Sequence, residues 1–397
     1  MTARNPYSGP AVLSAGFRPF FLLATMFGAL AIALWLAMRE GALSLSSVLS
    51  PVDWHVHEMI FGYGAAVVAG FLFTAVPNWT GRLPTRGAPL AVLSLVWIAG
   101  RLACAGFLGV GPWGVLMVDQ LFLLLVGAMI AREIIAGRNW RNLKVLLPVT
   151  AFWGANVAFH VEVLQTGFAA TTQRLGIAIL IFLIMLIGGR IIPSFTRNWL
   201  VKRSRDRLPA PFDRFDGFAI ATGVAALLFW VAQVSGPTSA LLFALAAGLQ
   251  AARLWRWRGL QTWRSPLLLM LHLSYAFIPA GFAVAALAAL GHTNAAASAH
   301  LLGAGAVGTM TLAVMIRATL GHTGRGLEAG PVGVAAFLAL MLAAVSRLLA
   351  EAAPALYEPF VVIAGMAWII GFLLAFGRIA IPVCRPRKAP GVPSRAP

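Results

Sequence analysis

Histidine is the residue type in this chain best suited to bind a metal ion, and the sequence contains seven histidines. Neutral imidazole is a common ligand for haem iron and for copper. Most of these histidines lie in or beside long apolar segments, where an unpaired polar group is costly. A single histidine at a membrane interface often does no more than reach toward water, so several of them in one layer are the better indicator of a metal site. Five are expected near one end of the apolar segments, namely His55, His57, His160, His292 and His300. The other two, His272 and His322, are expected near the opposite end.

Two of the histidines begin similar segments. His57 opens HEMIFGYGAAVVAGFLFTAVPNWTGR and His300 opens HLLGAGAVGTMTLAVMIRATLGHTGR, and a Thr-Gly-Arg follows each at the same distance. If the two segments face each other, His57 and His300 would bind the two axial positions of a haem b. Glycines on both segments would leave room for the flat ring, although close packing of helices explains them equally well. These are Gly62, Gly64, Gly303 and Gly305.

A second metal site is suggested by the neighbouring histidine. His55 and His57 are two residues apart, about 200° around a helix, so both cannot point at one metal. We therefore expect His55 to serve a different partner and, with His160, to form a copper site. His292 is a further candidate for that site, with a loop residue as the competing interpretation. Met59 is a candidate soft ligand.

Other polar residues fall inside the apolar segments, and each needs a partner there. Arg101 and Asp119 are expected at similar depth on adjacent helices and would pair. Alternatively, Arg101 and Arg347 would bind the propionates of a haem. Glu58 and Glu162, beside the histidines, would orient imidazoles or relay protons, and a polar network that locks helices together is the competing interpretation.

The elements that carry these residues are predicted to be membrane-spanning helices. The chain is 60% hydrophobic and only 11% charged, far outside the range of a soluble globule. A span needs about 20 mostly apolar residues, and only helices fit these long runs in lipid. The fold class is therefore all-α, a polytopic bundle of about 12 helices. The expected spans are 17–38, 54–76, 89–108, 112–133, 145–165, 173–193, 216–234, 238–255, 266–290, 295–319, 331–349 and 357–378.

The net charge of +18 is an orientation signal. With a cytoplasmic N-terminus, all Lys and Arg but four fall in cytoplasmic loops, tails or inner half-helices, as the positive-inside rule predicts for an even number of spans. Both termini are therefore expected in the cytoplasm, and a nucleic-acid partner is not expected. Three regions follow: a cytoplasmic segment 1–16, a single transmembrane domain 17–380 and a disordered basic tail 381–397. The four basic residues that fall outside the cytoplasmic parts are Arg39, Arg101, Arg174 and Arg347.

The equivalence of spans 2 and 10, and the parallel direction of span 6, suggest an internal repeat. Every fourth helix would correspond, giving three pseudo-symmetric four-helix units. The two cysteines, Cys104 and Cys384, are too far apart in this topology for a disulfide. Because no CxxCH occurs, any haem would be held by axial ligands alone.

Several strings in the chain resemble the NnrS family of the bacterial nitric oxide response. The resemblance covers nearly all helices and implies an inner-membrane protein that contains haem and copper and helps cells resist nitric oxide. It also implies six metal-site candidates: His55, His57, His160, His272, His300 and His322. The strings are GFRPFFLLA at 16–24, DWHVHEMIFGYGAAVVAGFLFTAVPNWTGR at 53–82, GGRIIPSFTRNW at 188–199, LHLSYAF at 271–277 and HLLGAGAVGTMTLAVMIRATLGHTGR at 300–325.

The helix count, with histidines on spans 2 and 10, is also similar to the catalytic subunit of haem-copper oxidases and nitric oxide reductases. The chain departs from them in having no HxxxYHH-like segment and no histidine on span 6. The usual copper or non-haem iron centre therefore cannot be assembled as in those enzymes, which argues against their reaction.

These expectations favour a haem protein, with copper as a second metal, that senses, binds or removes nitric oxide. Its partners would be the lipid bilayer, nitric oxide or another small gas, and a redox protein if it has haem-dependent redox activity. Two other classes remain. A secondary transporter would use the intramembrane charges to bind an ion or substrate, and an assembly factor would deliver haem or copper to another enzyme.

Overall fold

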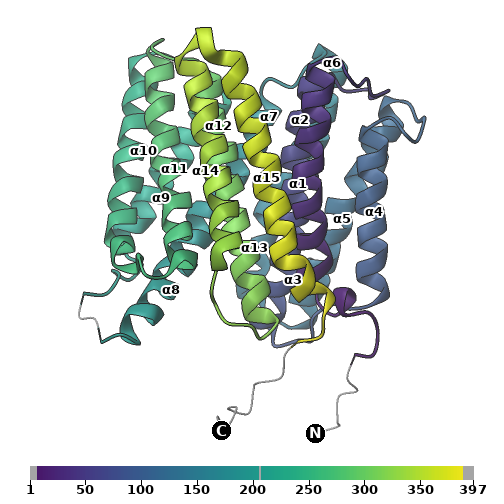
Figure 1. The fold of residues 1–397 in the computed structure, drawn as a ribbon, viewed down its shortest axis with the longest axis vertical. Coiled ribbons are helices and arrows are strands. Elements are labelled where there is room, and N and C mark those ends of the chain that lie inside the picture. Colours follow the sequence, from purple (N-terminus) through teal and green to yellow (C-terminus); the bar gives the residue numbers. More distant parts are fainter. Residues whose placement is uncertain (1–6, 205–206, 388–397) are drawn as a thin grey trace, which may run out of the picture.

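The computed structural model describes residues 7–204 and 207–387 and is built of helices (Figure 1). Within those residues, eleven helical spans are long and apolar enough to cross a membrane, and α4 (Ala88–Cys104) is a shorter apolar helix. The predicted bundle of about 12 helices is thus confirmed. The single-helix spans are α1 (Phe17–Arg39), α5 (Pro112–Ala136), α6 (Leu146–Thr166), α9 (Arg214–Val231), α10 (Pro237–Arg256), α11 (Pro266–Ala289), α14 (Gly330–Ala352) and α15 (Tyr357–Cys384).

Three spans contain a π-helical segment between two α-helices. Span 2 is α2 (Pro51–His57), η2 (Glu58–Gly64) and α3 (Ala65–Thr80). Span 6 is α7 (Thr172–Leu183), η4 (Ile184–Gly188) and α8 (Gly189–Val201). Span 10 is α12 (Ala295–His300), η6 (Leu301–Gly308) and α13 (Thr309–His322). The π-helical segments of spans 2 and 10 begin directly after His57 and His300, which supports the predicted equivalence of every fourth span. Such segments are rare and often occur at functional sites.

Residues at the helix ends explain where several spans begin. Ser50 caps α2 by accepting a hydrogen bond from the Asp53 backbone N–H, and Pro51 follows at the first helical position. Asn294 caps α12 in the same way, through the N–H of Ala296. At the other end, Gly81 and Gly167 adopt left-handed backbone conformations after α3 and α6. Local sequence therefore sets the ends of the spans that carry the polar residues.

Spans 2 and 10 lie inside the bundle. In their most apolar windows, 72% and 67% of residues are buried by other parts of the protein, more than in any other span. The Tyr63 hydroxyl of η2 lies 2.5 Å from the Thr311 hydroxyl of α13. The two similar segments therefore do face each other, and the helices around them face lipid.

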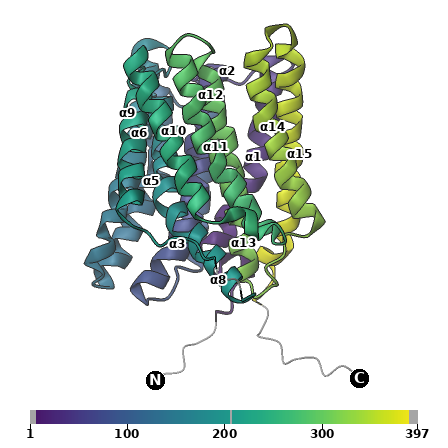
Figure 2. The same cartoon turned by 90° about the vertical axis from the view of Figure 1, so that its left-hand side faces the viewer.

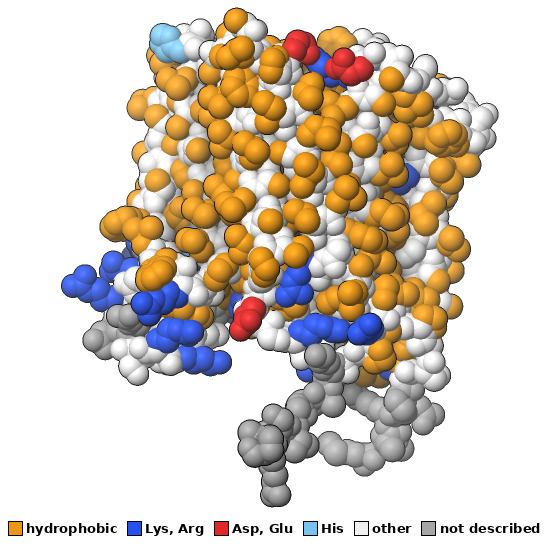
Figure 3. Space-filling model, viewed as in Figure 1, with side chains coloured by type: hydrophobic (Ala, Val, Ile, Leu, Met, Phe, Trp, Pro, Cys, Tyr) orange, Lys and Arg blue, Asp and Glu red, His pale blue; other side chains and the backbone are white. Residues whose placement is uncertain are grey.

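The beginning and the end of the described chain meet at one end of the bundle. Nη1 of Arg18 donates hydrogen bonds of 2.7 Å to the carbonyl oxygens of Val383 and Arg385. Figures 1 and 2 place η1 (Ala11–Leu13) and the end of α15 together at the lower end. Lys and Arg side chains gather at that end in Figure 3, below a surface dominated by hydrophobic side chains. We refer to it as the basic end and to the opposite one as the outer end.

The predicted tail begins too early. α15 continues to Cys384, so residues 381–384 are helical. Residues 388–397 of the tail and 1–6 of the predicted N-terminal segment lie outside the described residues.

Candidate metal centre

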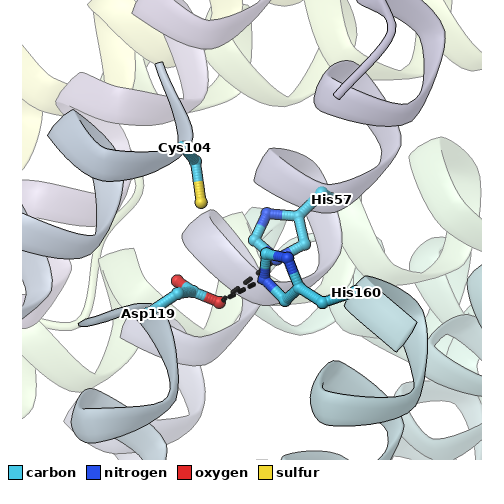
Figure 4. A group of neighbouring side chains, drawn as sticks. All are labelled: His57, Cys104, Asp119 and His160. Carbon is cyan, nitrogen blue, oxygen red and sulfur yellow. Dashed lines mark hydrogen bonds and ion pairs between the residues drawn. The ribbon is translucent and has the colours of Figure 1, made fainter. Parts of the chain in front are cut away.

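Four buried side chains with metal-ligand atoms meet near the outer end of the bundle. His57, Cys104, Asp119 and His160 each offer one ligand atom, and these atoms lie within 4.8 Å of one another. All four residues are buried. Figure 4 shows the two imidazole rings beside the Asp119 carboxylate, with the Cys104 sulfur pointing toward the same space. We call these four residues the metal cluster.

Each member comes from a different span. His57 ends α2 and Cys104 ends α4, while Asp119 lies on α5 and His160 on α6. α4 is joined to span 2 by the Trp97 indole N–H, which donates to the carbonyl oxygen of Gly62 at 3.0 Å. Four adjacent spans thus converge on one point without any of them being broken.

The two histidines are tied to the carboxylate and to an amide. Nε2 of His57 lies 2.9 Å from Oδ1 of Asn156 and 3.2 Å from Oδ2 of Asp119. Nε2 of His160 is also 3.2 Å from Oδ2 of Asp119. Nδ2 of Asn156 donates to the same oxygen at 2.7 Å, which fixes the orientation of the amide. The two imidazole centroids are 4.7 Å apart.

Glu58 and Arg101 surround the metal cluster. Oε1 of Glu58 lies 2.9 Å from Nδ1 of His57. Nη1 of Arg101 donates to both Glu58 oxygens at 3.0 Å, and its Nη2 donates to Oδ1 of Asp119. A Cβ at Gly62 would stand only 2.3 Å from Nη1 of Arg101, so the glycine is what admits the guanidinium.

The charges around the metal cluster do not balance among Arg101, Glu58 and Asp119. One guanidinium faces two carboxylates, which leaves one negative charge in a buried site. Both nitrogens of His57 face oxygens that accept hydrogen bonds, so the ring must carry two protons or direct a lone pair at a cation. A cation at Nε2 would therefore take the place of a proton and supply the missing charge.

The ligand set has a definite chemistry. Two imidazole nitrogens, one sulfur and one carboxylate oxygen make a mixed set of four donors, a type that binds zinc or copper. The contact from Glu58 to Nδ1 of His57 is the carboxylate partner that metal-bound histidines usually have. Cys104 would bind as the thiolate and release its proton.

The structure pairs the predicted histidines differently from the sequence. His57 lies with His160, whereas His55 stacks on Trp35, with ring centroids 4.5 Å apart. Nδ1 of His300 contacts the carbonyl oxygen of Ala296 at 2.8 Å. The predicted haem pair, His57 with His300, and the predicted copper pair, His55 with His160, are thus each split between two places.

The histidines pair differently from the prediction because of the direction in which each side chain leaves the helix of span 2. Two residues of helix turn His55 and His57 to opposite sides, so His57 faces α5 and α6 while His55 faces α1. His55 and His57 do serve different partners, as predicted, but His160 lies beside His57 and not beside His55. Two of the expected glycines serve close packing: a Cβ at Gly62 would meet Arg101, and one at Gly305 would lie 2.6 Å from the Phe277 ring.

The remaining predicted residues lie in several places. Arg101 pairs with Asp119, as one of the two interpretations expected. Nη2 of Arg347 donates to Glu351 at 3.0 Å, while its Nε and Nη1 are buried without a partner. Toward the basic end, Nε2 of His272 lies 2.9 Å from the Thr196 hydroxyl, and His322 packs near Phe17. His292 is exposed in the loop before α12.

Two residues of the site were not anticipated. Cys104 was considered only for a disulfide, and Asn156 was not assigned a role. Their spacing carried the signal: Arg101 and Cys104 are three residues apart on α4, and Asn156 and His160 are four apart on α6. Each pair therefore shares one helix face.

A family model described as NnrS protein matches residues 11–387, nearly the whole chain. No match was found among curated proteins. The match includes every residue of the metal cluster.

Proposed function

The chain belongs to the NnrS family, and from this premise we propose that it acts in the nitric oxide response of the bacterial inner membrane by binding a metal at His57, Cys104, Asp119 and His160. The observation that carries the proposal is the convergence of four buried ligand atoms within 4.8 Å. A set with a thiolate and two imidazoles suits copper, the metal that the family resemblance implies.

The surrounding side chains would hold the metal site in shape. Glu58 fixes the orientation of the His57 ring through Nδ1, and Arg101 holds Glu58 and Asp119 at the same time. Asn156 binds Asp119 and faces His57, which aligns the two ligands. This arrangement limits the reorganisation needed when a metal binds.

The haem implied by the family has a second set of suitable residues. His55 and His300 come from spans 2 and 10, and Arg347 comes from α14, which packs against the α12 helix that ends at His300. Nδ1 of His55 and both Nε and Nη1 of Arg347 are buried with no hydrogen-bond partner. If a haem binds here, His55 and His300 would hold its iron and Arg347 would pair with a propionate. A bound haem would supply an iron atom able to bind nitric oxide, a small uncharged gas that can arrive through lipid.

The test is metal analysis and an optical spectrum of the purified full-length protein. We expect copper at about one atom per chain, lost in His160→Ala and in Cys104→Ala. His292→Ala, an exposed histidine outside both places, is the matched control and should keep its copper. Full copper retention in both site variants would overturn the proposed centre.

The same preparation tests the haem residues separately. His55→Ala and His300→Ala should lose the Soret band and keep copper, because they lie outside the metal cluster. An unchanged Soret band in both would remove this haem assignment and leave the copper assignment standing. A colourless, metal-free protein would favour a transporter, and substoichiometric metal that passes to another protein would favour an assembly factor.

A further inference from the structure

A cavity of about 1130 Å³ runs along the bundle, apart from the metal cluster. Leu175 of α7 and Val231 of α9 line it toward the outer end, and Lys144 and His322 line it at the basic end. Most of the lining between them is apolar. The cavity therefore has the length and the character of a site for a hydrocarbon chain.

The cavity opens sideways to the lipid. Leu147 of α6 and Leu228 of α9 both line it, yet they are 73% and 61% exposed. Since both belong to membrane spans, their exposed surfaces face hydrocarbon rather than water. A molecule could enter from the bilayer between α6 and α9.

The lining carries charge of one sign only. Three basic side chains line the cavity, Lys144, Arg190 and Arg317, and no Asp or Glu does. In the part of the chain that the structure describes, none of the three forms a salt bridge; the buried arginines Arg101 and Arg253 each pair with a carboxylate.

Arg317 is the most informative of these residues. It belongs to span 10, one to two helical turns before that span ends at His322, and is only partly exposed. Its guanidinium lies 4.0 Å from the centroid of the Phe195 ring, which offsets part of the cost of a cation in that position. A charged residue inside a membrane normally has a partner of opposite sign, and this cavity is the space into which one would fit.

We propose that the cavity holds one anionic phospholipid. Its acyl chains would occupy the apolar length between α6, α7 and α9, and its phosphate would lie against Arg317, Arg190 and Lys144. Basic pockets between transmembrane helices at a cytoplasmic surface are known to hold anionic lipid headgroups. The lateral opening and the apolar length distinguish a lipid from a free anion, and the three unpaired cations distinguish it from a neutral lipid.

The experiment measures lipid bound to the full-length protein purified in mild detergent. Delipidated protein is offered phosphatidylglycerol and phosphatidylcholine with identical acyl chains, and native mass spectrometry counts what each chain keeps. We expect one phosphatidylglycerol per chain and little phosphatidylcholine. Arg317→Gln should weaken retention about fivefold, since one basic residue near a phosphate contributes about 1 kcal/mol. Arg317→Lys should restore most of it.

Two further variants separate charge from volume. Ala151→Trp lies on the lining and keeps all three cations while reducing the space, so it should also lose the lipid. Arg203→Gln is the control, because Arg203 stacks on Trp199 away from the cavity and should not matter. Equal retention of both lipids, or unchanged retention in Arg317→Gln, would overturn the proposal. Displacement of phosphatidylglycerol by millimolar inorganic phosphate would instead assign a small anion.

Discussion

Two buried clusters near opposite ends of the bundle are built around an arginine, and they differ in what that arginine must balance. Near the outer end, Arg101 faces Glu58 and Asp119. Near the basic end, Arg253 faces one carboxylate directly, with its Nε 2.7 Å from Oδ1 of Asp216. When His57 is neutral, the first arrangement carries one surplus negative charge, whereas the second is neutral.

The neutral cluster also makes several hydrogen bonds among its own members, although Nη2 of Arg253 is buried without a partner. Nη1 of Arg253 donates to the Tyr275 hydroxyl and to the Met185 carbonyl, each at 2.8 Å. Tyr275 donates to Gln250, whose amide nitrogen donates to the carbonyl of Ala219. We call Asp216, Gln250, Arg253 and Tyr275 the inner cluster. It offers no histidine or thiol, so it holds helices together, and the surplus charge near His57 is what marks the outer site for a cation.

The largest expected effect is on stability and comes from the inner cluster. Arg253→Met would leave Asp216 charged and buried without its main partner, which costs about 3–5 kcal/mol. Denaturant unfolding in detergent micelles measures the loss, and metal content per folded chain should stay unchanged. Arg256→Met is the comparison variant, because Arg256 lies at the rim, pairs with the exposed Asp213 and stands farther from Asp216, at 3.6 Å, so its removal should cost much less stability. Equal losses in the two variants would refute the assignment of the inner cluster as structural.

A matched pair of glycines tests the two clusters by the same change. A Cβ at Gly62 would meet Nη1 of Arg101 at 2.3 Å, and one at Gly189 would meet Nη2 of Arg253 at 2.1 Å. Overpacking of this kind costs about 1–3 kcal/mol. We expect Gly62→Ala and Gly189→Ala to lose similar stability, but only Gly62→Ala to lose metal affinity as well. Metal titration of both proteins measures this difference. A loss of metal affinity in Gly189→Ala would show that the two clusters are coupled.

A smaller effect should follow from removing the carboxylate behind His57. Glu58→Gln keeps a hydrogen-bonding group beside Nδ1 but removes its charge, and loss of such an outer contact lowers metal affinity about 10–100-fold. Glu162→Gln is the control near the same end of the bundle, because Glu162 accepts hydrogen bonds from the backbone N–H groups of Thr171 and Thr172. Unchanged affinity in Glu58→Gln would mean that His57 does not need Glu58 to bind metal.

The sequence predicted the helix bundle well because each membrane span must be a long and mostly apolar helix. The first span was expected at 17–38 and is Phe17–Arg39, since a break in apolar character is visible in any window. The match between spans 2 and 10 was also readable, and both contain a π-helical segment at the same place. The partners of His57 could not be predicted from the sequence, because they depend on how far each helix is rotated about its axis. Cys104 shows the same limit: its role follows from facing α5, which composition does not reveal.

The smallest effect belongs to the rim of the inner cluster and concerns pH. Asp213 precedes α9, outside the spans, and the hydrogen bond from Arg256 lowers its pKa to about 2 from a usual value of 3.8. Because the folded-state pKa is the lower one, the pair stabilises the protein above about pH 4, and this contribution is lost as the pH falls toward 2. Asp213→Asn keeps the helix cap but removes the charge, so its unfolding midpoint should approach that of the unmodified protein as the pH falls through this window. Fully exposed ion pairs contribute little to stability. A large difference between the unfolding midpoints of the two proteins at pH 7 would therefore show that Asp213, and not Asp216 alone, is needed to balance the arginines of this region.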